Sequence, residues 1–393
     1  MSNYSDRTAV AAIVLSLTAH VGANPSTWTV TNLHPSRAAE SFAYRISNGQ
    51  QVGWSTVGGA HHASVWTGSA ASWVDLHPAG ASLSEAYGVY DGMQVGRAVV
   101  GGVDRATLWS GSAPGVNLTP SGSPSSQAQG ISAGTQVGYA AVNGWNHAGT
   151  WSGSSATWAS LHPSPTLLSQ AHGADGEQQV GVTVADASAP NHAALWSGSS
   201  SSWVDLHPAD ATWSWARAVD DGQQVGWIFL DGVGHASLWN GTAESWVDLT
   251  PEGATESWGQ DVHAGRQAGY ARFDGVYHAG IWSGSAESWE DISLALTGSW
   301  GNTYANGVWS DANTIYVVGS GFNVQSGRNE ALLWSRPIAP PAPGDINGDG
   351  IVNAADLGVL LGAWGSNSTA ADLDGDGVVG GSDLAILLGA WTG

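Results

Sequence analysis

Two loops near the end of the chain carry oxygen-bearing side chains at alternate positions. In the first loop, Asp345, Asn347 and Asp349 occupy positions 1, 3 and 5, while Ile351 is at position 7 and Asp356 at position 12. Carboxylate, amide and backbone carbonyl oxygens at this spacing wrap a calcium ion with about seven ligands. The loop therefore predicts a Ca²⁺ site, to which Ile351 contributes its backbone carbonyl.

The second loop repeats the first with more negative charge. Asp372, Asp374 and Asp376 occupy positions 1, 3 and 5, and Val378 and Asp383 follow at positions 7 and 12. A leucine-rich stretch follows each loop, DLGVLLGAW and then DLAILLGAW, and predicts one short helix per loop. A domain this small has little core, and its carboxylates repel one another. We therefore expect it to be largely unfolded without calcium.

Two departures separate these loops from an EF-hand. Position 12 is Asp instead of Glu, and a proline-rich stretch, not a helix, precedes the first loop. In both respects residues 344–393 resemble a type I dockerin domain. The alternative, a solvated acidic tail, gives no reason for D-x-[ND]-G-D-G-x-V to occur twice with a helix behind it. The resemblance implies two structural Ca²⁺ ions and a cohesin-like module or cell-surface scaffold as partner. The contacts would come from loop positions 10 and 11, here Ala354, Ala355, Gly381 and Ser382.

Residues 27–336 repeat one pattern seven times, about every 43 residues. Each unit offers four short β-type runs between glycine-rich turns. This predicts an all-β, seven-bladed β-propeller in preference to a β-helix or an open solenoid. The repeat opens with TWTVTNLHP, which matches the last strand of a unit, and the final unit stops after three strands. We therefore expect the N-terminal strand to close the ring. The motifs HASLW, QQVGW and WVDLHP resemble the HAF repeat of bacterial extracellular proteins.

The N-terminus, the linker and the charge predict where the protein acts. Arg7, the apolar run TAVAAIVLSLTA and the small residues ending at Ala23 predict a signal peptide over residues 1–23, the alternative being a buried strand or helix. Residues 337–343 are proline-rich and predict a stiff linker to the small domain. The net charge of −22 argues against nucleic acid as a partner, and no stretch is apolar enough to span a membrane. We expect a protein secreted to the extracellular space or cell surface of a bacterium.

The run before each V-G pair alternates constant small residues with variable large ones. The constant Ser/Thr and Ala/Gly positions predict a crowded place near the propeller axis. The variable pairs are Phe42 and Tyr44, Glu85 and Tyr87, Gln127 and Gln129, Gln170 and His172, Trp215 and Arg217, Trp258 and Gln260, and Tyr304 and Asn306. Period two places both members of a pair on one side of their strand. If this strand is innermost, aromatic and planar hydrogen-bonding groups line the axis, and such a lining suits a sugar. Packing against the next blade is the alternative. The candidate ligand-binding residues are Glu85, Tyr87, His172, Trp215, Arg217, Trp258 and Gln260.

Residues that recur in every unit are expected to belong to the scaffold. The repeated histidines are interpreted as hydrogen-bonding struts between strands, and not as metal ligands. The repeated tryptophans are expected to pack between blades.

Three functions are compatible with these features. The first is a secreted calcium-binding protein whose propeller binds a glycan or another extracellular surface, and whose dockerin-like tail anchors or assembles it. The second is a polysaccharide-degrading enzyme, a glycoside hydrolase, with Glu85 and Asp261 as the carboxylates to test; no catalytic motif surrounds either residue. The third is a purely structural surface protein.

Overall fold

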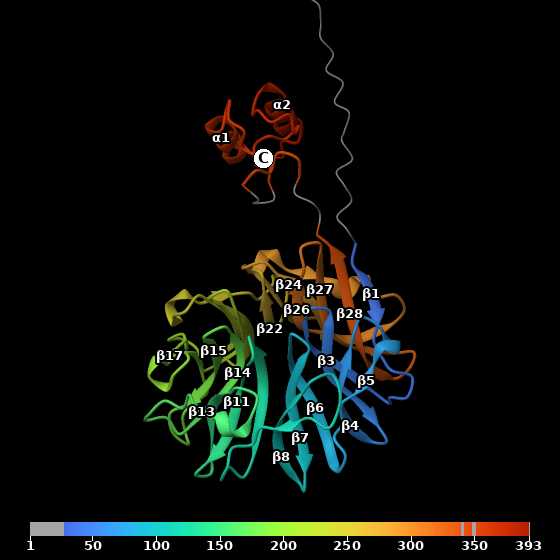
Figure 1. Cartoon of the computed structure of the whole chain (residues 1–393), viewed down its shortest axis with the longest axis vertical. Coiled ribbons are helices and arrows are strands. Elements are labelled where there is room, and N and C mark those ends of the chain that lie inside the picture. Colours follow the sequence, from blue (N-terminus) through green and yellow to red (C-terminus); the bar gives the residue numbers. More distant parts are fainter. Residues whose placement is uncertain (1–26, 339–341, 348–350, 393) are drawn as a thin grey trace, which may run out of the picture.

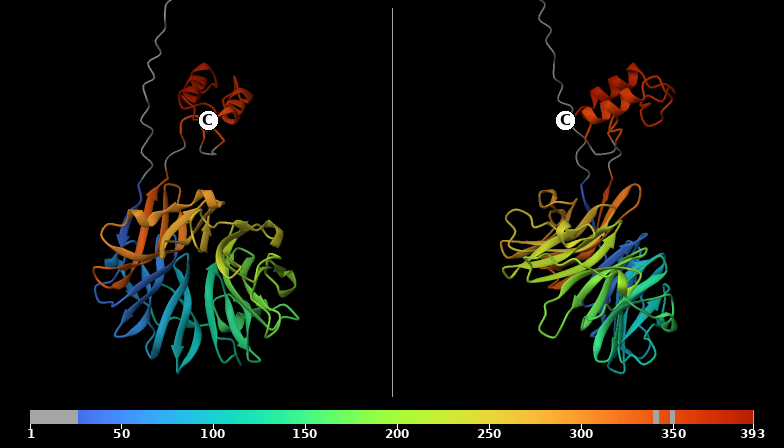
Figure 2. Two further views of the ribbon diagram at one scale, coloured as in Figure 1. Left: turned by 180° about the vertical axis from the view of Figure 1, so that it is seen from behind. Right: turned by 90° about the vertical axis from the view of Figure 1, so that its left-hand side faces the viewer.

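The computed structural model describes residues 27–338, 342–347 and 351–392. Residues 27–338 form seven antiparallel sheets of four strands each, arranged as the blades of a ring (Figures 1 and 2). The predicted seven-bladed propeller is confirmed, as are the two short helices after it. The predicted signal peptide, Asp349 and part of the proline-rich linker lie outside the described residues.

Each blade is a meander of four strands. The innermost strands are β2 (Ser41–Ser47), β6 (Ala81–Tyr90), β10 (Ser126–Ser132), β14 (Leu168–Asp175), β18 (Trp213–Asp220), β22 (Ser257–His263) and β26 (Trp300–Ser310). The second strands are β3 (Gln50–Val57), β7 (Met93–Val100), β11 (Thr135–Val142), β15 (Gln178–Val184), β19 (Gln223–Leu230), β23 (Arg266–Phe273) and β27 (Thr314–Asn323). The third strands are β4 (Ala60–Trp66), β8 (Val103–Trp109), β12 (Trp145–Trp151), β16 (His192–Ser197), β20 (Val233–Trp239), β24 (Val276–Trp282) and β28 (Arg328–Pro337). The outermost strands are β5 (Val74–Asp75), β9 (Val116–Asn117), β13 (Ala159–Ser160), β17 (Val204–Asp205), β21 (Val247–Asp248), β25 (Glu290–Asp291) and β1 (Thr29–Asn32). Short 3₁₀ turns occur at η1 (Ala70–Ser72), η2 (Ser155–Thr157), η3 (Ser200–Ser202), η4 (Ala243–Ser245), η5 (Ala286–Ser288) and η6 (Ile292–Ala295).

The N-terminal strand closes the ring, as predicted. Strand β1 pairs antiparallel with β28, from Thr29 opposite Ser335 to Asn32 opposite Leu332 (Figure 1). The Asn32 amide also donates to the Glu330 carboxylate at 2.7 Å. The last blade therefore combines the first and the last strands of the repeat region, which removes two free sheet edges.

Constant residues join neighbouring blades. The Ser84 hydroxyl of β6 accepts a hydrogen bond at 2.9 Å from the backbone N–H of Ala63 in the preceding blade. An equivalent bond joins Ala106 to Ser126, Ala148 to Ser169, Ala193 to Ser214, Ala236 to Ser257, Ala279 to Thr303 and Ala331 to Ser41. The constant small residues therefore lie on the innermost strand, as expected, but they pack against the preceding blade and do not face the axis.

The seven repeated tryptophans are almost completely buried. Trp109, for example, packs against Val52, Ala63 and Leu76 of the preceding blade. This confirms the predicted packing between blades and places the largest apolar side chains where they join one sheet to the next.

The repeated histidines are struts, as predicted. His62 pairs through Nδ1 with the Asp75 carboxylate of the outermost strand at 2.8 Å. The same pair recurs at His192 and Asp205, His235 and Asp248, and His278 and Asp291. His77 bridges Ser84 Oγ at 2.8 Å and the Ala81 carbonyl at 3.0 Å. These imidazoles satisfy groups of the scaffold.

The C-terminal region consists of two loop–helix units with helices α1 (Ala354–Gly362) and α2 (Gly381–Gly389), which lie side by side in both views of Figure 2. Its buried core consists of Val352, Leu360, Ala371, Val379 and Leu387. Neither α1, α2 nor any other helix of the described residues is long and apolar enough to cross a membrane.

Candidate functional site

Each innermost strand contains a β-bulge at the same place. The register between β6 and β7 shifts between Ala86 and Gly88, so Tyr87 has no partner in the ladder. The residues skipped in this way in the seven blades are Tyr44, Tyr87, Gln129, His172, Arg217, Gln260 and Asn306. All seven, together with Arg45, line one cavity of about 260 Å³. Because a bulge re-aims one side chain, the repeated bulges build a ring of variable residues around the axis.

The glycine of each V-G pair makes room for the bulge. A Cβ atom on Gly96 would lie 1.9 Å from the backbone oxygen of Glu85, and Gly53, Gly138, Gly181, Gly226, Gly269 and Gly319 face an equivalent carbonyl. Glycine is therefore needed in the V-G pair, because the second strand passes close to the backbone of the innermost strand.

The sequence left open whether the variable pairs line the axis or pack against the next blade, and the structure shows both. The second member of each pair lines the axial cavity. Some first members pack within or between blades: Phe42 stacks on Trp54 with 4.4 Å between ring centroids, and Glu85 binds His61 and Arg97. Two others, Trp215 and Trp258, line a separate groove.

His172 is held as a neutral ring. Trp215 donates its indole N–H to His172 Nδ1 at 2.8 Å, and the two rings stack at 5.2 Å. Burial, reinforced by the positive charge of Arg217, lowers the pKa of His172 to about 3. An indole nitrogen only donates, so Nδ1 is the acceptor and the ring proton resides on Nε2. The neighbouring Ala216 oxygen, 3.3 Å from Nδ1, therefore receives no hydrogen bond from the His172 ring.

Arg217 has no counter-ion among the described residues. Its guanidinium forms no ion pair with any described residue, and Nε is buried without a hydrogen-bond partner. Burial, followed by repulsion from Arg45, lowers the pKa of Arg217 to about 10, so the group is positively charged at neutral pH. The side chain lies over Trp227, with 6.0 Å from its terminal carbon to the ring.

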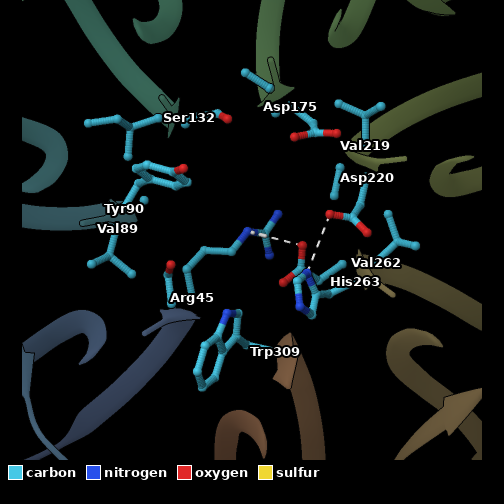
Figure 3. A pocket seen from close by; sticks show the side chains of 18 of the residues that line it. Arg45, Val89, Tyr90, Ser132, Asp175, Val219, Asp220, Val262, His263 and Trp309 are labelled. Atoms are coloured by element: carbon cyan, nitrogen blue, oxygen red, sulfur yellow. Dashed lines mark hydrogen bonds and ion pairs between the residues drawn. The ribbon is translucent and has the colours of Figure 1, made fainter. Parts of the chain in front are cut away.

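A second cavity, of about 300 Å³, adjoins the first and shares Arg45, Gln129 and His172 with it. Figure 3 shows Arg45 extending into its middle. Arg45 pairs with Asp261 at 3.6 Å, and the Val308 backbone N–H donates to Asp261 at 3.0 Å. Burial raises the pKa of the Asp261 carboxyl, although Arg45 opposes this.

Arg45 was not identified as a site residue from the sequence, although it departs from the residue type that the repeat has at this position. Position 88 and its equivalents hold Gly or Ala in five blades, whereas the other two hold Arg45 and Asp261. The two departures from the repeat meet in the structure.

Glu85 and Asp261 are not brought together. Glu85 lines neither axial cavity, whereas Asp261 lines the second. Burial alone would raise the pKa of Glu85, but hydrogen bonds from Tyr87 and His61 and the charge of Arg97 lower it. Glu85 is a tightly bound carboxylate of the scaffold.

Trp215 and Trp258 line a third cavity, an aromatic groove of about 530 Å³. Its other aromatic residues are Trp213, Trp227 and Phe229, and Trp213 is 51% exposed. Trp258 meets Trp227 edge to face, with 5.2 Å between centroids. The groove belongs to the β18 and β22 blades. The sequence did not distinguish these three additional residues from the many scaffold aromatics.

The second acidic loop gathers a donor set for a hard cation. Carboxylate oxygens of Asp372, Asp374 and Asp376 all lie within 4.8 Å of one another. Asp383 stabilises the loop backbone by accepting from the N–H groups of Leu373 (2.6 Å), Asp374 (3.1 Å) and Gly380 (2.6 Å). These backbone donors lower the pKa of Asp383. Clustered carboxylates of this kind fit Ca²⁺.

The first loop has the same construction where it is described. Asp356 accepts from the backbone N–H groups of Ile346, Asn347 and Asn353 at 2.8 to 3.1 Å. These bonds lower the pKa of Asp356. Asp345 and Ile351 belong to the described part of this loop.

The family comparison agrees with this geometry. Residues 343–389 match the Dockerin type I domain, so the C-terminal region is a type I dockerin domain. Such domains bind calcium and dock onto cohesin modules. The likeness of the repeats to HAF repeats stays a prediction.

Comparison with curated proteins found no relative of the chain. Among solved structures, the chain is similar to a puromycin hydrolase S511A mutant complexed with PGG, at 12% identity and a TM-score of 0.51 over 78% of this chain and 56% of that one. It is also similar to acylaminoacyl peptidase from Pyrococcus horikoshii, at 8% identity and a TM-score of 0.50 over 79% of this chain and 54% of that one. The chain thus spans little more than half the length of these structures. At such identities the likeness shows the propeller fold alone.

Proposed function

We propose that the propeller binds a glycan through the aromatic groove and the axial cavity, and that the dockerin domain anchors the protein to a cohesin-bearing scaffold outside the cell. The aromatic groove carries the first part of the proposal. Trp213, Trp215, Trp227 and Trp258 present indole faces and edges at one site, together with Phe229. Aromatic faces pack on the C–H patches of sugar rings, and a half-exposed tryptophan has apolar surface to gain by doing so.

Docking through the tail is the second part of the proposal. Dockerin domains bind cohesin modules and occur in extracellular, cell-surface cellulosome components. We propose that two Ca²⁺ ions order the two loops through the residues predicted above. The surface around Ala354, Ala355, Gly381 and Ser382 would then meet the partner.

Retention on polysaccharides tests the propeller. The full chain would be passed over a panel of plant, algal and bacterial polysaccharides, alongside the variants Trp213→Ala and Trp145→Ala. Trp145 is a matched control, because it is 44% exposed but lies outside the groove. We expect Trp213→Ala to lose at least about tenfold in affinity, as for a stacking contact of about 1.4 kcal/mol, and Trp145→Ala to bind normally. Equal binding by both variants, or no retention on any polymer, contradicts the proposal; complete absence of retention would favour a purely structural protein.

The docking test uses a panel of cohesin modules, with calcium and with EGTA. We expect calcium-dependent capture of the full chain by at least one module. Capture that persists in EGTA contradicts the proposed role of the ions.

Hydrolysis of a glycoside is a second candidate function, supported by one observation. Asp261 and Asp220 line the same cavity, and their pKa values are displaced in opposite directions. Burial raises the pKa of Asp261. Burial alone would also raise the pKa of Asp220, but a hydrogen bond from His263 lowers it overall. Two carboxyls at one site whose pKa values are displaced in opposite directions are what an acid and a base require. Release of reducing ends from the same panel, lost in Asp261→Asn, would support hydrolysis, whereas retention without product favours the binding protein.

A further inference from the structure

We infer that the bound sugar is acidic: the axial cavity takes an anionic group of the glycan, a carboxylate or a sulfate, with Arg217 as its counter-ion. This inference rests on the proposed glycan-binding function and names the class of sugar. It follows from the charge, the free donors and the size of the cavity.

Two arginines line the axial cavity, Arg45 and Arg217, and only Arg45 has a carboxylate partner among the described residues. Arg97 pairs with Glu85 at 2.9 Å, and Arg45 pairs with Asp261 at 3.6 Å. Arg272, Arg328 and Arg336 likewise pair with glutamates. No acidic side chain is among the described residues that line the Arg217 cavity. An enclosed cation without a counter-ion is unfavourable unless a ligand or water compensates it, and a planar guanidinium suits an oxyanion best.

The neighbouring groups add donors. His172 keeps its ring proton on Nε2, because Nδ1 accepts from Trp215. Tyr44 accepts from the indole N–H of Trp54 at 2.8 Å, which leaves its own O–H free to donate. Neutral donors beside a cation favour an anionic oxygen over a hydroxyl that must also donate.

The overall charge limits how many anionic groups can bind. The chain carries a net charge of −22, which repels a polyanion along most of the surface. The cavity, at about 260 Å³, is at the small end for ligand sites. One acidic residue, free or at the end of a glycan, therefore fits better than a continuous acidic stretch.

The aromatic groove and the axial cavity are lined by neighbouring residues of the same two strands. Trp215 and Arg217 are two residues apart on β18, and Trp258 and Gln260 are two residues apart on β22. In each pair the tryptophan lines the groove and its partner lines the cavity. A sugar stacked in the groove can thus direct a charged substituent towards Arg217.

Matched sugars test the inference on the full chain. Binding of D-glucose, D-glucuronate, D-glucose 6-sulfate and inorganic sulfate would be measured by ligand-observed NMR titration. The variants are Arg217→Met, Arg217→Lys and, as control, Arg105→Met, which removes an arginine that does not line the cavity. Thermal melting verifies that each variant is folded.

We expect wild type to bind at least one acidic sugar about tenfold or more tightly than glucose. The better of glucuronate and glucose 6-sulfate identifies the anionic group. Arg217→Met should abolish this preference without abolishing binding of glucose, Arg217→Lys should restore part of it, and Arg105→Met should keep it.

Equal binding of acidic and neutral sugars by wild type would overturn the inference but leave the proposed glycan binding intact. A preference that survives in folded Arg217→Met, or binding of inorganic sulfate without either acidic sugar, would also overturn it. Failure of every sugar and of every polysaccharide in the panel would overturn both.

Discussion

The propeller and the dockerin domain are both built from sequence repeats, yet they achieve order by different means. Seven repeats close into a ring in which each blade buries its tryptophan against the preceding one. Two repeats cannot close, and the dockerin core comprises five buried residues beside two short helices. From this difference we expect that a repeat number large enough for closure replaces an external source of stability, whereas a pair of repeats needs an ion.

The two regions also use carboxylates differently. In the propeller, Asp75 and its equivalents face histidines, and Glu330 faces several donors. In the dockerin domain, Asp372, Asp374 and Asp376 face one another. Protein side chains form hydrogen bonds to the first set, and we expect a cation to neutralise the second.

Calcium removal should have the largest effect, and it should destabilise the dockerin domain but not the propeller. With EGTA, we expect α1 and α2 to lose essentially all protection from amide hydrogen exchange, because metal binding and folding are coupled in so small a domain. The propeller strands should keep their protection, and calcium should restore that of the helices. Helices that stay protected in EGTA would show that the five-residue core suffices.

Glu330→Ala should cause the next largest effect, because it removes the acceptor that joins the two ends of the ring. The carboxylate accepts from Asn32 at 2.7 Å, Asn323 at 3.1 Å and Arg328 at 2.8 Å. We expect a loss of about 2 kcal/mol in the free energy of unfolding of the propeller, measured by urea titration. Glu330→Gln, which keeps the shape, should lose less. An unchanged urea midpoint in Glu330→Ala would mean that strand pairing alone closes the ring.

Acid should destabilise the propeller through the same residue. Burial alone would raise the pKa of Glu330, but hydrogen bonds from Arg328, Asn323, Asn32 and Ser326 lower it to about 2. Because the folded pKa lies below the ordinary value, this contribution is complete above about pH 4.5 and is lost as the pH falls towards 2. Unfolding free energies from pH 6 to pH 2.5 should therefore decline more steeply in wild type than in Glu330→Gln. Parallel curves would assign the acid sensitivity to other carboxylates.

His62→Ala should have the smallest effect. The His62–Asp75 pair is partly exposed and is one of several equivalent struts. We expect a loss of about 1 kcal/mol or less in the urea experiment, with Asp75→Asn as a companion variant. A loss as large as that of Glu330→Ala would mean that an ordinary blade depends on its strut as much as the closing blade does.

Much of the fold follows from the sequence, because closure is a property of strand order. The opening TWTVTNLHP and the three-stranded last unit together require β1 beside β28. The dockerin loops follow from the spacing of their oxygen ligands, which is local in the chain.

The candidate site was only partly predictable. The variable positions were visible, but the bulge that sends Arg217 to the axis and leaves Trp215 in the aromatic groove depends on backbone register. The pairing of Arg45 with Asp261 joins residues far apart in the sequence, and only a comparison of all seven repeats shows both as departures from Gly or Ala. Trp213 and Trp227 were overlooked because tryptophan is also the common scaffold residue here.

The seven bulges have a consequence for how such proteins diverge. Each bulge residue lies outside the strand ladder, so its exchange leaves the register of its blade intact. Gene duplication can therefore copy a blade whole, and later substitutions can alter one point on the axial ring at a time. The axial ring can therefore vary at seven positions while the architecture is inherited unchanged.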